Sequence, residues 1–88
     1  MVDLIDAVYI ENYKIHLFFE DKINGIVDFS DYIGKGVVFS KFRDIEYFKN
    51  FQINKDIGTI CWDDNVDISP ETLYLKVTNN TPVTQSDV

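Results

Sequence analysis

The stretch Asp56–Tyr74 decides the fold, and it reads DIGTICWDDNVDISPETLY. Gly58 permits a turn, because glycine tolerates backbone conformations that other residues avoid. A short apolar strand ending at Trp62 follows, and then a polar loop. Ser69 stands at the N-cap position of a helix whose first residue is Pro70, where the missing N–H costs nothing. We therefore expect a turn, a strand, a loop and a closing helix.

Three strands are expected ahead of residue 30. Residues 4–10 are rich in β-forming side chains. Residues 13–19 alternate, which places His16 and its polar neighbours on the wetter face of a sheet. Residues 23–29 form the third strand, in which Gly25 marks a bulge or the close approach of another backbone. The pattern predicts an antiparallel meander.

The period changes after Gly36. Residues 30–33 are expected to form a helical turn, and apolar residues then recur every three positions at Phe39, Phe42, Ile45 and Phe48. Asp44 is the expected N-cap of a helix over residues 45–50. Residues 51–53 and 59–62 are expected to pair as a hairpin.

These elements predict one α+β domain over residues 1–77 and a flexible polar tail over residues 78–88. The sheet is expected to be small and antiparallel, with an N-terminal three-stranded meander and a short C-terminal hairpin. Two or three short helices are expected to pack against it.

Composition excludes several classes of protein. The chain has 88 residues, a net charge of −7 and 45% hydrophobic residues, so it is expected to fold and not to attract duplex nucleic acid. The single Cys61 excludes an internal disulfide and a multi-cysteine metal site. No signal peptide or membrane-spanning segment is evident, so we expect a cytoplasmic protein and no membrane partner.

Two motifs carry a resemblance to a known family. One is FxxFRDxxYF from Phe39, and the other is GTIxWxxxxDIxPExLY from Gly58. Over roughly residues 3–76 the chain resembles the bacterial family catalogued as domain of unknown function 2442. The chain departs from that family's pattern at Lys22, where the family usually has Gly at a hairpin turn, and at residues 63–65, where it favours Pro-Asn-Gly.

The resemblance implies a small antiparallel sheet with short helices packed against it. Members of the family occur alone or attached to a helix-turn-helix segment, and they are often encoded beside small toxin-like proteins. The resemblance therefore implies an antitoxin or toxin-partner role. It carries no catalytic residue over to this chain.

Two chemical sites can be weighed from the residues. The spacing of Asp63, Asn65 and Asp67 matches the start of a calcium loop, but Ile68 and Tyr74 stand where such a loop needs Gly and Glu. Cys61 and His16 can be imagined as a nucleophile and its base. Cys61 lies in an apolar strand, however, and no third orienting residue is signalled, so we expect no enzyme and no cofactor.

Charge is distributed unevenly along the chain. Residues 1–34 have two lysines and seven acids, residues 35–55 have five basic and two acidic residues, and residues 56–88 have one lysine and six acids. The favoured interpretation is that the basic segment solvates short amphipathic helices. The alternative is a positive patch for an acidic partner or an RNA backbone, formed by Lys41, Arg43 and Lys49.

These observations favour a non-enzymatic protein-interaction module, an antitoxin-like partner of a small neighbouring protein. It is expected to bind a protein partner or a second copy through a sheet edge. The alternative function is a nucleic-acid-associated regulator that uses the basic segment 35–55. No small-molecule substrate is evident in the sequence.

Overall fold

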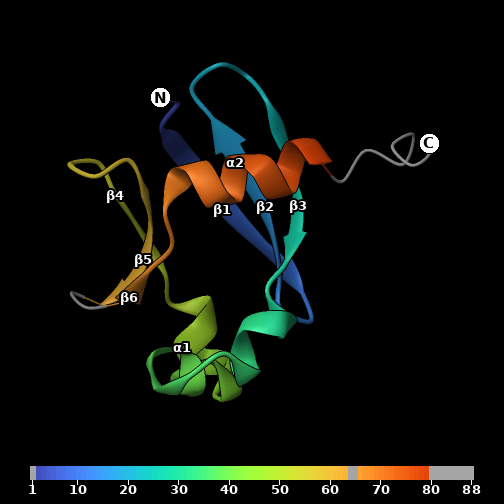
Figure 1. Ribbon diagram of the computed structural model, residues 1–88, viewed down its shortest axis with the longest axis vertical. Helices are drawn as coiled ribbons and strands as arrows, with labels where there is room; N and C mark the ends of the chain where they lie inside the picture. The colour runs from blue at the N-terminus through green and yellow to red at the C-terminus, as the bar shows by residue number, and fades with distance from the viewer. Residues whose placement is uncertain (1, 64–65, 80–88) are drawn as a thin grey trace.

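An antiparallel meander forms the first sheet of the protein. The computed structural model in Figure 1 describes residues 2–63 and 66–79. Its first three strands pair in the order β1-β2-β3, and they are β1 (Leu4–Glu11), β2 (Lys14–Phe19) and β3 (Asn24–Asp28). The predicted meander is therefore confirmed.

Both turns of the meander use left-handed backbone conformations. Asn12 and Tyr13 form a two-residue turn with φ of 47° and 69°, and Lys22 in the second turn has φ of 75°. Two-residue hairpin turns of this kind favour Asn and Gly, because a Cβ atom crowds the backbone when φ is positive. Tyr13 is held there by packing, since its ring centroid lies 4.9 Å from that of Phe48.

Alternation along β2 and β3 separates a buried face from an outer one. Ile15, Leu17 and Phe19 are buried on β2, and Val27 is buried opposite Ile15 on β3. Gly25 continues the β2–β3 pairing in register, so no bulge occurs there. A Cβ atom on Gly25 would lie 2.9 Å from Val77 Cγ1, so this glycine makes room for a helix side chain and not for another backbone.

Three short helical segments follow β3. They are the 3₁₀ helices η1 (Ser30–Gly34) and η2 (Val37–Arg43) and the helix α1 (Ile45–Lys49). The predicted cap of α1 is confirmed, because Asp44 Oδ1 accepts a hydrogen bond from the Glu46 N–H at 3.0 Å. Phe39 and Phe42 are three residues apart within η2, as expected for one turn of a 3₁₀ helix, whereas Phe48 belongs to α1.

The second sheet has the order β4-β5-β6 and is antiparallel. Its strands are β4 (Gln52–Asn54), β5 (Thr59–Asp63) and β6 (Val66–Asp67). The hairpin of β4 and β5 was predicted, whereas β6 was not, because a two-residue strand carries no period. Gly58 has φ of 69° in the hairpin turn, and its carbonyl accepts a hydrogen bond from the Leu4 N–H at 2.9 Å. This bond joins the two sheets.

The closing helix α2 (Pro70–Asn79) crosses one face of the β1–β3 sheet (Figure 1). Its predicted cap is confirmed, since Ser69 Oγ accepts a hydrogen bond from the Thr72 N–H at 3.1 Å. Leu73 is fully buried, and Val77 is half-buried over Gly25. The helix includes two residues that the sequence analysis assigned to the polar tail, and residues 80–88 lie outside the described part of the chain.

Four aromatic rings make the centre of the core. Phe42 and Trp62 have ring centroids 4.5 Å apart, and Phe42 and Phe48 have centroids 5.0 Å apart. Phe29, which follows β3, lies 5.8 Å from Phe48 and 6.1 Å from Trp62. The indole Nε1 of Trp62 donates a hydrogen bond to the Phe48 carbonyl at 2.7 Å. These contacts tie the first sheet, the helical segments and the second sheet into one α+β domain.

None of the helices in the described ranges is long and apolar enough to span a membrane.

Candidate interaction surfaces

The two residues weighed as a nucleophile and base lie in different sheets. His16 is on β2, and Cys61 is on β5, where it is paired with Gln52 and Asp67. Cys61 is half-exposed, because its neighbours Ile60 and Trp62 take the buried side of the strand. The thiol of Cys61 therefore lies outside the buried core. Consecutive residues of a strand point to opposite faces, and this alternation places Cys61 on the face opposite to Ile60 and Trp62.

The calcium-like loop yields no cluster of ligands among the residues described. No group of three or more His, Cys, Asp or Glu side chains there could hold a metal ion. Asp63 accepts a hydrogen bond from the Tyr47 hydroxyl, and Asp67 is exposed on β6. Asn65, the middle residue of the predicted set, lies outside the described residues.

The side chains of the predicted basic patch are all exposed, and they are Lys41, Arg43 and Lys49. Lys41 Nζ lies 3.9 Å from Asp63 Oδ2, and Lys49 Nζ lies 3.9 Å from Glu46 Oε2. Each of these two ammonium groups also stands near an aromatic ring, with Lys41 5.7 Å from the Tyr47 centroid and Lys49 5.4 Å from that of Tyr9. Nearby carboxylates therefore offset part of the positive charge of the patch.

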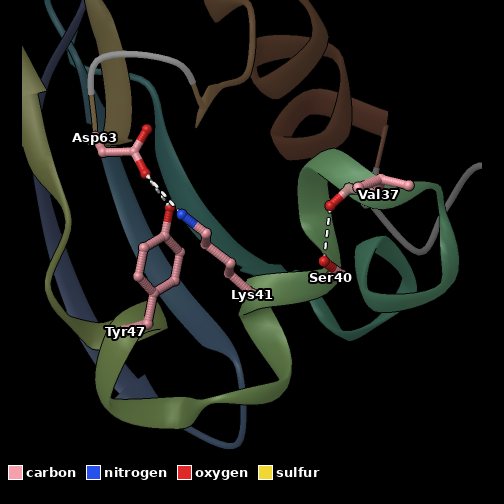
Figure 2. A network of polar contacts seen from close by, with 5 residues as sticks. All are labelled: Val37, Ser40, Lys41, Tyr47 and Asp63. Carbon is pink, nitrogen blue, oxygen red and sulfur yellow. Dashed lines mark hydrogen bonds and ion pairs between the residues drawn. The ribbon is translucent and has the colours of Figure 1, made fainter.

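Figure 2 shows how Lys41 and Tyr47 converge on Asp63. The Tyr47 hydroxyl donates to Asp63 Oδ2 at 2.8 Å. Burial, and next to it the hydrogen bond to this carboxylate, raises the pKa of Tyr47 to about 12. On the η2 side of the same view, the Ser40 hydroxyl donates to the Val37 carbonyl at 2.7 Å (Figure 2). The network holds the basic segment against β5, which is a structural role.

A different surface stands out on the side of β1–β3 that faces away from the buried core. We call it the outer face, and it comprises the outward residues Asp6, Val8, Ile10, Lys14, His16, Phe18, Asn24, Ile26 and Asp28. Val8, His16 and Ile26 are directly opposite one another and form its central row. Val8 and Ile26 are each 48% exposed, and Ile10 is 44% exposed. Apolar side chains on the two flanking strands, β1 and β3, are therefore exposed to solvent.

Two aromatic rings occupy the middle strand of the outer face. The imidazole of His16 is stacked on Phe18, with centroids 4.2 Å apart and an interplanar angle of 17°. His16 Nε2 lies 2.9 Å from Asn24 Oδ1. When Nε2 carries a hydrogen, it donates a hydrogen bond to this amide oxygen. The two rings are thus held flat against each other beside the apolar row.

Carboxylates border the outer face. Asp6 is paired with Phe18 at one end, and Lys14 stands between Glu11 and Asp28 at the other. The pKa of Asp28 is lowered mainly because its carboxylate accepts a hydrogen bond from the Ser30 backbone N–H. The positive charge of Lys14 lowers this pKa further. Asp6 and Asp28 of the outer face, together with the adjacent Glu11, outnumber its one lysine, so this surface is acidic as well as apolar.

The sequence predicted a wetter face here but not its apolar content. The alternation of β2 was visible, with His16 and Lys14 in outward positions. Val8 and Ile10 carried no such signal, because both faces of β1 read as apolar until the pairing is known, and Ile26 stands alone between the polar residues Asn24 and Asp28.

Comparison with known protein families identified a match over most of the chain. The family model described as "Protein of unknown function (DUF2442)" matches residues 4–79. No curated protein and no solved structure matched the chain.

Proposed function

The chain belongs to the DUF2442 family, and we propose that this member is a non-enzymatic protein-interaction module of the cytoplasm. Its role is that of an antitoxin-like partner, which binds a small protein encoded beside it. The proposal is supported above all by the outer face, where Val8, Ile10 and Ile26 expose apolar surface on one side of a sheet.

Exposed apolar surface on the outer face costs free energy in water. Scattered exposed apolar residues are ordinary, but a contiguous group on one face marks an interaction surface. Burial of one Val or Ile side chain is worth about 1.5–3 kcal/mol when it is complete. A partner that covers the central row of the outer face recovers part of that free energy, and this is the driving force we assign to binding.

Charge favours a protein partner over nucleic acid. The net charge of −7 opposes approach to phosphates, and two of the three cations predicted to form a basic patch lie within 4 Å of carboxylates. The alternative function, a regulator that uses segment 35–55, is therefore the less supported one.

The experiment is co-expression with the adjacent gene product. We expect the two proteins to co-purify as a stoichiometric complex, and we expect the neighbour to arrest growth when it is expressed alone. The same neighbour should be harmless when this chain is present. If no complex forms and the neighbour is harmless by itself, the antitoxin role is wrong.

A further inference from the structure

We infer that the outer face docks a protein surface that combines apolar side chains with lysine or arginine. The inference rests on the proposed function and names the class of partner and the surface that binds it.

The apolar residues of the outer face are grouped around His16. Val8 and Ile26 flank His16 in the central row, and Phe18 lies two residues from His16 on the same side of β2. α2 packs on the opposite side of the sheet, where Val77 covers Gly25 and Tyr74 contacts Phe19. Within the described part of the chain, α2 therefore leaves the outer face open to a partner.

Charged side chains lie at both ends of this central row. Asp6, Glu11 and Asp28 lie at its two ends, and Lys14 faces both Glu11 and Asp28 across the strands. The one cation of the surface is thus already beside two carboxylates. Complementary potentials steer partners together and exclude wrong ones, so the matching surface carries positive charge around an apolar centre.

The carboxylates around the outer face also exclude other occupants. A second copy would bring the carboxylates of one outer face against those of another, and its net charge is also −7. Nucleic acids and anionic lipid surfaces repel the same carboxylates. The stacked rings of His16 and Phe18 add an aromatic surface, on which a guanidinium group packs well.

The experiment uses two synthetic peptides of equal length, one alternating Val with Lys and the other alternating Val with Glu. Each is titrated into the isotopically labelled full chain, and amide chemical shifts are followed. We expect the Val-Lys peptide to shift the amides of Val8, His16 and Ile26 with saturation, and the Val-Glu peptide to give no saturable change. Raising the salt from about 0.05 M to about 0.3 M should weaken the first interaction about tenfold, since surface charges are then screened.

Two substitutions test the surface itself. Val8→Thr and Ile26→Thr keep a β-branched side chain but remove apolar surface, and together they should weaken the Val-Lys peptide about tenfold. Val37→Thr is the matched control, because Val37 is 87% exposed on η2, and it should leave binding unchanged. Equal binding of both peptides, shifts confined to other elements, or no saturable binding at all overturns the inference.

The two proposals can fail separately. If the neighbouring gene product forms no complex while the Val-Lys peptide occupies the outer face, the antitoxin role fails and the docking surface stands. If the neighbour binds the V8T/I26T double variant as tightly as the wild type, the interaction module stands and the outer face is not its surface.

Discussion

Lys22 shows at the scale of one residue how this chain differs from its family. Its φ of 75° lies in the left-handed region, where a side chain beyond Cβ brings strain. The resemblance implied a glycine at this turn, and the structure gives the physical reason for it. The lysine is tolerated because β2 and β3 are paired on either side of the turn.

Replacement of this lysine is the first prediction. Lys22→Gly should raise the free energy of unfolding by about 0.5–1 kcal/mol, because relief of left-handed strain exceeds the entropic cost of a glycine. Urea denaturation measures the change. Lys35→Gly is the control, since Lys35 has φ of −101° and should gain nothing. Equal gains in both variants would show that the charge and not the backbone is responsible.

The Tyr47 hydroxyl gives a pH-dependent prediction. Its pKa is raised in the folded protein from the ordinary 10.0 to about 12, so the neutral phenol is favoured by folding. The stabilisation is complete below pH 10 and is lost as the pH rises toward 12. Tyr47→Phe should cost about 1–2 kcal/mol at neutral pH, as expected for a hydrogen bond to a carboxylate.

Denaturant titrations of the wild type and of Tyr47→Phe across alkaline pH measure this effect. The difference in stability between the two proteins should shrink between pH 10 and pH 12. A difference that stays constant across that range would contradict the assignment of the hydrogen bond to Asp63.

At the scale of elements, the contact between β3 and α2 depends on the absence of one side chain. Gly25→Ala would place a Cβ atom 2.9 Å from Val77 Cγ1, and overpacking of this kind costs about 1–3 kcal/mol. Adding Val77→Ala should recover part of the loss, because the opposing methyl groups are removed. A double-mutant cycle should show a coupling energy of about 1 kcal/mol. Additive effects would mean that the helix shifts away freely.

Elements with local signals were the ones that the sequence predicted well. Asp44 and Ser69 cap helices because their side chains reach the N–H groups of the residues two or three positions ahead, and this needs no knowledge of the rest of the fold. The strand β6 and the 3₁₀ form of η2 were missed. β6 pairs with β5 only three to six residues back along the chain, and it was missed because a two-residue strand carries no hydrophobic period. The threefold spacing over η2 was visible, but such spacing fits an α-helical stripe as well as a 3₁₀ helix.

At the scale of the whole molecule, charge decides which partners are excluded. We predict that the wild type does not retain duplex DNA or single-stranded RNA in gel-shift assays at about 0.15 M salt, since binding needs net neutralisation of phosphates. The variant Lys41→Glu/Arg43→Glu/Lys49→Glu should behave identically. Salt-dependent retention by the wild type that the variant abolishes would establish the alternative function.

The candidate surfaces show the limit of reading charge along a chain. The basic segment was visible because its cations are close in sequence, yet Lys41 is beside Asp63, which lies on another element. The outer face was hidden for the opposite reason, since Val8 and Ile26 become neighbours of His16 only through strand pairing. Surfaces assembled from distant residues require the fold.

The aromatic core also supplies an optical probe. Trp62 is the single tryptophan of the sequence, it is 6% exposed, and its indole N–H is bonded to the Phe48 carbonyl of α1. Its fluorescence therefore depends on whether α1 is docked on β5, and the emission should move to longer wavelength when that contact opens to water. Folding kinetics of this domain can be followed in stopped-flow experiments on the unlabelled native chain, with one fluorophore at the junction of its two sheets.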